Sequence, residues 1–327
     1  MAGIKTVKIA SFFSGCGGMD LGLLGGFSYL GKRYKKFPAR IVYAIDSDKR
    51  ACDLYNINFD HKCLLGDIRK IPKNNLPSHD ILVGGFPCQS FSIVAQNPPR
   101  LGYKDENGKL FFEMRDVLKA KKSRAFIAEN VKGILSANDK QTFPLIIEAF
   151  EKEGYHVTFA LLNSSDYGIP QKRERVFIVG FRDKEKFDKF KFPDPVTVGK
   201  DKIPLKRAIL PPGRIPERYF FSKKALDGLR RANKSMNKGR AQRLDEPCNT
   251  INSHLAKVSL NSTDPVLKIK GRYRRFTPLE AARIQSFPDS FKFNGPDSKQ
   301  YWAIGNAVPP VLMWHVANSV YKALNIT

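Results

Sequence analysis

Apolar runs alternate with helix-like segments through the first half of this chain, and that alternation constrains the fold most strongly. The strand-like apolar runs occupy residues 6–15, 39–46, 62–67, 79–86, 123–130, 155–163 and 173–182. Helix-like segments lie between most of them, at residues 19–31, 47–59, 111–122 and 141–154. Strands that alternate with helices predict βαβ units around a mainly parallel sheet, and therefore an α/β fold.

The pattern changes after Arg182, where periodicity weakens and Pro and Lys become frequent. Residues 181–275 hold 25 Lys and Arg against 10 Asp and Glu, a net charge of +15 in 95 residues. We expect an α/β domain over residues 1–182 and a small, irregular, basic domain over residues 183–300. An apolar helix near the C-terminus needs a core to pack against, so residues 301–327 should complete the first domain.

One helix start in this part of the chain is marked by its own residues. In "RFTPLEAARIQSF", Thr277 is the expected N-cap, Pro278 the first helical residue and Glu280 the capping-box partner.

Composition limits the classes of partner and the cellular setting. The 327 residues carry a net charge of +25, which favours nucleic acid as a partner over an anionic membrane surface. No apolar run approaches the roughly 18 residues that span a bilayer, and we see no secretory signal. The five cysteines lack CxxC pairing, which argues against a disulfide framework and against a structural zinc site. A reducing cytoplasm fits this cysteine usage best, and we expect no bound metal.

Polar residues and glycines follow the first three strands. The stretch "FFSGCGGMDLG" supplies Gly15, Gly17 and Gly18, which permit a tight turn and a close approach to a ligand. Asp46 ends the second strand, where carboxylates in nucleotide-binding α/β folds commonly bind the ribose hydroxyls, and Asp67 ends the third strand. The set predicts an adenosine-like cofactor with hydroxyls and an amino group.

A cysteine follows the fourth strand in "GGFPCQSFS". A buried structural cysteine is the plain alternative for Cys88. However, Glu129 ends the next strand, and Arg173 and Arg175 come just before another. A thiolate that attacks, a carboxyl that handles a proton and arginines that bind a carbonyl oxygen suit addition to an electron-poor heterocycle.

Six motifs in order resemble the DNA (cytosine-5)-methyltransferase family over most of the chain. They are "FFSGCGGMDLG", "GGFPCQSFS", "AENVKGI", "DYGIPQKRERVFIVGF", "RRFTPLEAARIQSFPDSF" and "IGNAVPP". The resemblance implies a Rossmann-like S-adenosylmethionine-dependent catalytic domain with a target-recognition domain. It implies methylation of C5 of a flipped-out cytosine in a specific duplex DNA sequence, as in bacterial type II modification enzymes.

The same resemblance implies roles for individual residues. Cys88 would add to C6, Glu129 would hold N3, Arg175 would contact O2, and Arg173 would orient Glu129 or the ring. The residues implied at the S-adenosylmethionine site are Phe13, Gly15, Gly17, Gly18, Asp46, Asp67, Pro87 and Asn306. Ser47 departs from the bulky residue that many members have there, which puts one stacking contact in doubt.

Residues 89–108 form a polar, turn-rich stretch that resembles the family's loop that closes over DNA. We expect Gln89, Ser90, Ser92 and Arg100 to contact DNA. The family also suggests a monomer, and a cognate restriction endonuclease that acts separately.

Three other readings stay open at this point. One is an RNA methyltransferase of the same fold, and a second is a DNA-binding protein that has lost catalysis. The third is a nicotinamide-dependent oxidoreductase, which only the glycine turn suggests.

Overall fold

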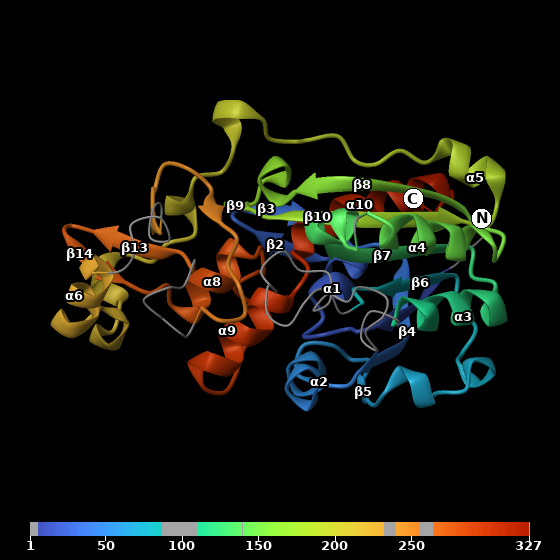
Figure 1. Cartoon of the computed structure of the whole chain (residues 1–327), viewed down its shortest axis with the longest axis horizontal. Helices are drawn as coiled ribbons and strands as arrows, with labels where there is room; N and C mark the ends of the chain where they lie inside the picture. Colours follow the sequence, from blue (N-terminus) through green and yellow to red (C-terminus); the bar gives the residue numbers. More distant parts are fainter. Residues whose placement is uncertain (1–5, 87–109, 139, 232–239, 256–263, 327) are drawn as a thin grey trace.

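A seven-stranded sheet forms the middle layer of the right-hand part of the molecule in Figure 1. The computed structural model describes residues 6–86, 110–138, 140–231, 240–255 and 264–326. In spatial order the strands are β5 (Leu64–Leu65), β4 (Ala39–Asp46), β1 (Val7–Phe12), β6 (Ile81–Gly84), β7 (Ala125–Val131), β10 (Glu174–Phe181) and β8 (His156–Asn163). Neighbouring strands from β5 to β7 are parallel, whereas β10 is antiparallel to both β7 and β8. The predicted mainly parallel α/β sheet is confirmed, and its topology is Rossmann-like.

Both faces of the sheet are buried because successive side chains of each strand point to opposite sides. On β7, Ala125 and Ile127 belong to one core cluster, and Phe126 and Ala128 to the other. The first cluster includes side chains of α1 (Gly18–Leu24), α2 (Lys49–Asn56) and α10 (Pro310–Ala323). The second includes side chains of α3 (Phe111–Lys121) and α4 (Thr142–Glu151). Side chains of the C-terminal helix thus pack with those of the first region.

The helical pattern predicted over residues 19–31 is wrong beyond Leu24. Gly25 and Gly26 have φ values of 62° and 83°, and a Cβ on Gly25 would lie 2.0 Å from the carbonyl oxygen of Lys35. The chain must turn there, since only glycine fits. A hairpin of β2 (Phe27–Tyr29) and β3 (Lys32–Tyr34) follows instead.

The predicted strand over residues 62–67 is present but short. β5 has two residues, and both of its leucine side chains are exposed.

The region after β10 is irregular, with short strands and several 3₁₀ turns. Before α10, its described helices are α5 (Lys184–Lys189), α6 (Lys223–Arg231), α8 (Pro278–Ile284) and α9 (Asp297–Asn306). Its strands are β11 (Ala241–Gln242), β13 (Val266–Ile269), β14 (Arg272–Arg274) and β12 (Cys248–Asn249), which pairs with β9 (Gln171–Lys172). A third core cluster joins this region to Cys16 and Leu54 of the first.

A buried ion pair organises the start of α8. The two guanidinium Nη atoms of Arg274 each donate to one oxygen of Glu280, both at 2.7 Å, and these side chains are 2% and 0% exposed. Glu280 also accepts from the backbone N–H groups of Thr277 and Leu210, at 2.8 and 2.9 Å. The predicted capping box is confirmed, with Thr277 as N-cap and Pro278 at the first turn.

Removing one partner of this pair should be costly. We predict that Glu280→Gln lowers the free energy of unfolding by about 3–5 kcal/mol, because it leaves the Arg274 charge buried without its counter-ion. Urea denaturation followed by tryptophan fluorescence measures the change. Glu217→Gln removes the exposed partner of Arg272 and is the matched control, which should leave the midpoint almost unchanged. Equal shifts in both variants would contradict the prediction.

Candidate active site

The glycine turn after β1 is fastened to the end of β4. The backbone N–H of Gly15 donates to Asp46 Oδ2 at 2.8 Å, and the N–H of Asp48 donates to Asp46 Oδ1 at 2.9 Å. Burial raises the pKa of Asp46 above its usual value, and these two hydrogen bonds oppose that effect. Gly15 has a φ of 57°, and a Cβ there would meet none of the described atoms within 4 Å. The turn is therefore open above Gly15.

Gly17 and Gly18 are required by packing against the protein itself. A Cβ on Gly17 would lie 2.2 Å from the ring of Phe59, and one on Gly18 would lie 2.5 Å from the carbonyl oxygen of Val308. Their small size lets the start of α1 approach α2 and the α9–α10 turn. The sequence pattern indicated a ligand here, and it could not reveal these contacts.

Phe13 and Asn306 lie in accessible positions, and Asp67 is already engaged. Phe13 is partly exposed with a φ of 54°, an uncommon conformation for a non-glycine residue. Asn306 is exposed at the last residue of α9. Asp67 caps the 3₁₀ turn that follows β5, and its ion pair with Arg69 lowers its pKa.

Glu129 and Arg175 form an ion pair between adjacent strands. Arg175 Nε lies 3.1 Å from Glu129 Oε1, and the two side chains are only 13% and 11% exposed. Phe177 is directly opposite Glu129 in the antiparallel pairing of β10 with β7, so Arg175 lies diagonally across from it. Burial raises the pKa of Glu129, and the charges of Arg175 and Arg173 oppose that shift.

The segment that leads to Cys88 runs beside this pair. A Cβ on Gly85 would lie 3.2 Å from Glu129 Oε2. Asn130 Nδ2, on the next residue of β7, donates to the carbonyl oxygen of Phe86 at 3.2 Å. Asn130 was not singled out from the sequence, although it lies in the "AEN" motif. The predicted residues Pro87, Cys88, Gln89, Ser90, Ser92 and Arg100 lie outside the described residues.

Arg173 is buried and holds three carbonyl groups. Its Nη1 donates to Ile251 O at 3.1 Å, and its Nη2 donates to Gly305 O and Ala307 O at 2.9 and 3.2 Å. Only 2% of the residue is exposed, and burial lowers its pKa well below the usual arginine value. Its hydrogen bonds therefore join the sheet to the basic region and to the α9–α10 turn.

Two buried glutamines that sequence reasoning missed complete this junction. Gln171 Nε2 donates to Gln285 Oε1 at 2.6 Å, and Gln285 Nε2 donates to Ala307 O at 2.5 Å. Gln171 Oε1 accepts from the N–H of Ile251 at 2.9 Å. Both lie within the quoted motifs, but an exposed and a buried glutamine look alike in a sequence.

Neither a membrane span nor a metal cluster is found in the described part of the chain. None of its helices is long and apolar enough to cross a membrane. None of the described His, Cys, Asp and Glu side chains form a group of three or more that could hold a metal ion.

Comparisons with known proteins bear on this geometry. The family model for the C-5 cytosine-specific DNA methylase matches residues 7–322. The type II methyltransferase M.HaeII of Haemophilus aegyptius is 36% identical, over 99% of this chain and 95% of its own length. M.Bsp6I of a Bacillus strain is 32% identical, over 97% and 99%.

The chain belongs to the C-5 cytosine-specific DNA methylase family. It is a DNA cytosine-5 methyltransferase. Solved structures of more distant proteins share the fold. An Entamoeba histolytica methyltransferase has a TM-score of 0.76 at 18% identity and covers 98% of this chain and 99% of its own. The Dnmt2 methyltransferase of S. pombe has a TM-score of 0.74 at 18% identity, with 98% and 100% covered.

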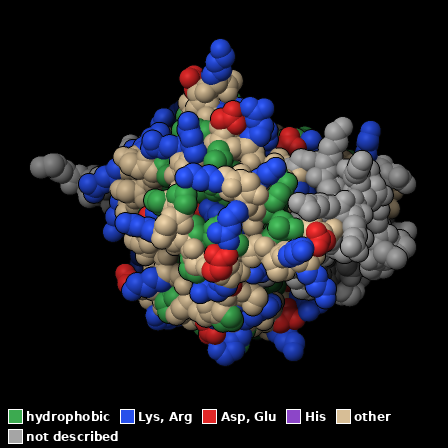
Figure 2. All heavy atoms as spheres, turned by 90° about the vertical axis from the view of Figure 1, so that its left-hand side faces the viewer, with side chains coloured by type: hydrophobic (Ala, Val, Ile, Leu, Met, Phe, Trp, Pro, Cys, Tyr) green, Lys and Arg blue, Asp and Glu red, His purple; other side chains and the backbone are tan. Residues whose placement is uncertain are grey.

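Cations cover the end of the methylase that is formed by residues after β10 (Figure 2). The exposed ones in its described part are Lys206, Arg207, Arg214, Arg218, Lys223, Lys224, Arg243, Lys268, Lys270, Arg272 and Lys292. Such a surface suits a polyanion.

A buried carboxyl group lies beneath the glycine turn of the methylase. Asp20 is 0% exposed, and Ser11 Oγ donates to its Oδ2 at 3.0 Å. Ser14 Oγ in turn donates to Ser11 Oγ at 3.0 Å. Burial raises the pKa of Asp20 to about 7, although the hydrogen bond from Ser11 opposes the shift.

This carboxyl should make stability fall as pH rises. The pKa of Asp20 is about 7 in the folded state and about 3.9 in the unfolded state. At pH values between these two, Asp20 is therefore more protonated in the folded state than in the unfolded state. The contribution of Asp20 is full below about pH 4 and is lost as pH rises through about 7. We predict that wild type loses stability relative to Asp20→Asn over this window, measured by urea denaturation at several pH values.

Asp53→Asn is the control, because Lys49 lowers the pKa of exposed Asp53. Because the pKa of Asp53 is lowered in the folded state, its contribution to stability has the opposite pH dependence. That contribution is present above the unfolded pKa and is lost as pH falls through the folded pKa. A constant difference between wild type and Asp20→Asn would show that Asp20 does not titrate in this window.

Proposed function

We propose that this methylase transfers a methyl group from S-adenosylmethionine to C5 of a flipped-out cytosine in a specific duplex DNA sequence, through a covalent Cys88 adduct at C6. The observation that carries the proposal is the buried Glu129–Arg175 pair, which lies against Gly85 just before the Cys88 segment. A proton-handling carboxyl and a cation thus stand beside the backbone that leads to the thiol.

The chemistry explains why these groups are needed together. C5 of cytosine is a poor nucleophile, and a bond from the Cys88 sulfur to C6 moves the ring π electrons toward C5. Glu129 would hold N3, so that negative charge does not accumulate on the ring. Burial raises its pKa and so makes Glu129 easier to protonate, and a protonated carboxyl can donate to N3. Arg175 would bind O2. Once C5 has taken the methyl group, a base accepts the C5 proton, and the C6–S bond breaks to release the Cys88 thiolate and restore the ring.

The family suggests that Arg173 orients Glu129 or the cytosine ring, and we propose that it acts as a positioning residue. Its described hydrogen bonds all go to carbonyl oxygens, and it influences Glu129 through its charge. It would set the position of the turn around Asn306 relative to β10.

The strand-end residues fit an adenosine-type cofactor. Asp46 offers a half-buried carboxylate suited to ribose hydroxyls, beside the open face above Gly15. Bound there, S-adenosylmethionine would supply the electrophilic methyl group. The residues that would hold it are Phe13, Gly15, Gly17, Gly18, Asp46, Asp67, Pro87 and Asn306.

DNA would approach the edge of the sheet that carries Glu129. A base inside a duplex cannot reach a buried carboxyl, so the target must be flipped out at a cost of a few kcal/mol. We propose residues 183–300 as the target-recognition domain on a catalytic domain of residues 1–182 and 301–327. Gln89, Ser90, Ser92 and Arg100 would contact the DNA. We also propose that the enzyme is a monomer and that it protects host DNA from a cognate restriction endonuclease, which acts separately.

Methyl transfer to defined substrates tests this function. We expect radiolabelled methyl groups from S-adenosylmethionine to enter duplex DNA and not tRNA. Cys88→Ser should abolish transfer because a hydroxyl is a far weaker nucleophile at neutral pH. Glu129→Gln should lower kcat by about 10²–10⁴-fold, as loss of a general acid does.

The control for folding is thermal unfolding, which should be similar for Cys88→Ser and wild type. A covalent adduct with 5-fluorocytosine DNA should form with wild type and be absent from Cys88→Ser. Transfer to tRNA alone, or full activity of Cys88→Ser, would contradict the proposal.

DNA affinity should fall steeply with salt. Each phosphate contact releases counter-ions, so several contacts predict a loss of at least about 100-fold between about 50 and 200 mM salt. Fluorescence anisotropy with a labelled duplex measures the slope. A flat response would exclude the cationic end as the main DNA-binding surface.

A further inference from the structure

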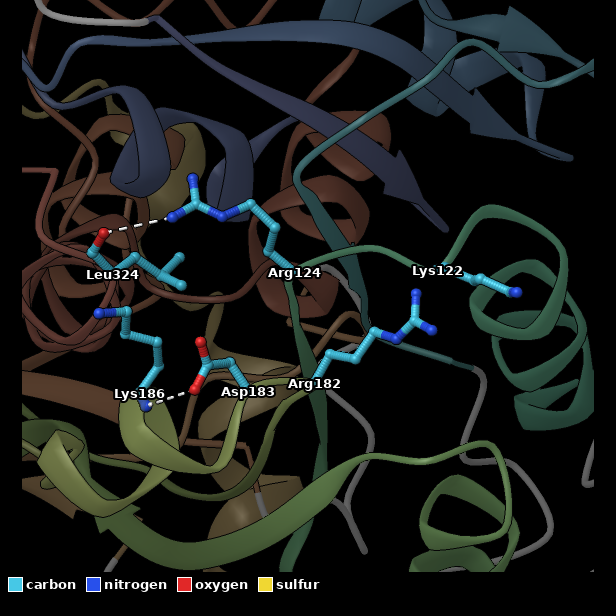
Figure 3. Close-up of a pocket in the computed structure, with 6 residues that line it drawn as sticks. All are labelled: Lys122, Arg124, Arg182, Asp183, Lys186 and Leu324. Carbon is cyan, nitrogen blue, oxygen red and sulfur yellow. Dashed lines mark hydrogen bonds between the residues drawn. The ribbon is translucent and has the colours of Figure 1, made fainter.

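A basic hollow lies at the edge of the sheet opposite to Glu129. β10 runs antiparallel to β7, so its last residue, Phe181, pairs with Ala125 at the start of β7. Arg182 and Arg124 adjoin that pair, and the N–H of Arg182 donates to the carbonyl oxygen of Arg124 at 3.0 Å. The hollow has a volume of about 320 Å³ and is lined by Lys122, Arg124, Arg182, Asp183, Lys186 and Leu324 (Figure 3).

Four of the six lining residues are cations, and they come from two stretches of the chain, residues 122–124 and 182–186. With Asp183 as the one carboxylate, the lining has a net charge of +3. Asp183 is occupied at the start of α5, where its side chain accepts from the N–H groups of Glu185 and Lys186. Within the described residues Lys122 and Arg182 form no ion pair. Their charges therefore remain available to an anion.

The other two cations are held near the C-terminal helix. Arg124 Nη2 donates to the carbonyl oxygen of Leu324 at 3.3 Å, and Arg124 Nη1 lies 4.0 Å from Asp80 Oδ1. Lys186 Nζ lies 3.4 Å from Glu185 Oε1, in an ion pair between adjacent residues. Figure 3 shows both side chains extending toward Leu324, whereas Arg182 extends toward the Lys122 side. The hollow thus has cations on two sides and one apolar wall.

These features favour a small anion with more than one phosphate. A guanidinium group can donate two parallel hydrogen bonds to a phosphate group. A concave site lined by charges of one sign also strengthens the electrostatic field felt by an ion of the opposite sign. The volume is at the low end for small-molecule pockets. A duplex bound at Glu129 lies along the other edge of the sheet, so this hollow is separate from the proposed DNA-binding surface.

We propose that this hollow is a second ligand site, which binds a small polyphosphate anion of the nucleotide class. Inorganic pyrophosphate and ATP are the probes, titrated into the full-length protein at low salt by calorimetry. Saturable binding of either probe is expected. Lys122→Glu with Arg182→Glu should weaken it by at least about tenfold, because two charge-assisted contacts are lost and replaced by repulsion.

Lys32→Glu with Arg33→Glu is the matched control. It makes the same change in charge at two exposed residues of the β2–β3 hairpin, and it should alter pyrophosphate affinity by less than about threefold. Methyl transfer by the Lys122 and Arg182 double variant should stay at the wild-type rate. Lys122→Gln with Arg182→Gln, which adds no negative charge, should give an intermediate affinity.

Three outcomes overturn the proposal. One is the absence of saturable binding by wild type, and another is equal weakening in the hollow and control variants, which marks a general charge effect. The third is a loss of duplex affinity in the hollow variant as large as its loss of pyrophosphate affinity. That result would make the hollow a contact for the DNA backbone.

Discussion

The arrangement of the site depends on the hydrogen bonds from the buried guanidinium of Arg173 to three backbone carbonyl oxygens. A buried charge is costly unless it is well hydrogen-bonded, and here three carbonyl dipoles supply that stabilisation. Gly305 belongs to the last turn of α9, where the carbonyl end of the helix dipole favours a cation. A Cβ on Gly305 would lie 2.2 Å from the backbone nitrogen of Ser253, so the basic region passes directly against this turn. One side chain thus joins three segments distant in sequence.

Burial also sets the electrostatic character of the catalytic edge. It raises the pKa of Asp20, Asp46 and Glu129, which lie beneath the turn, at the end of β4 and at the end of β7. Backbone N–H groups oppose the shift at Asp46, and arginines oppose it at Glu129. All three carboxyl groups along this part of the sheet therefore take a proton more readily than they would in water.

Much of this could be predicted from the sequence because strands and caps depend on local patterns. The alternation of apolar runs predicted the sheet, and Thr277 and Glu280 predicted the start of α8. Predictions were wrong or incomplete where distant contacts decide. Helical spacing of Leu and Met could not show that Lys35 forces a turn at Gly25. Glycines that suggest a ligand turned out to accommodate Phe59 and Val308, and nothing local separates Arg173, which clasps carbonyls, from Arg175, which pairs with Glu129.

The direction of β10 has a consequence for how the chain can vary in length. Arg175 meets Glu129 only because Phe177 is in register with it, and strand side chains alternate between faces. A single residue inserted or deleted between Arg175 and Phe177 would turn Arg175 to the other face of the sheet, and one between Phe177 and Arg182 would instead move Arg182 along the far edge. Relatives should therefore keep the length of this strand fixed, while the irregular segments beyond α5 accommodate insertions.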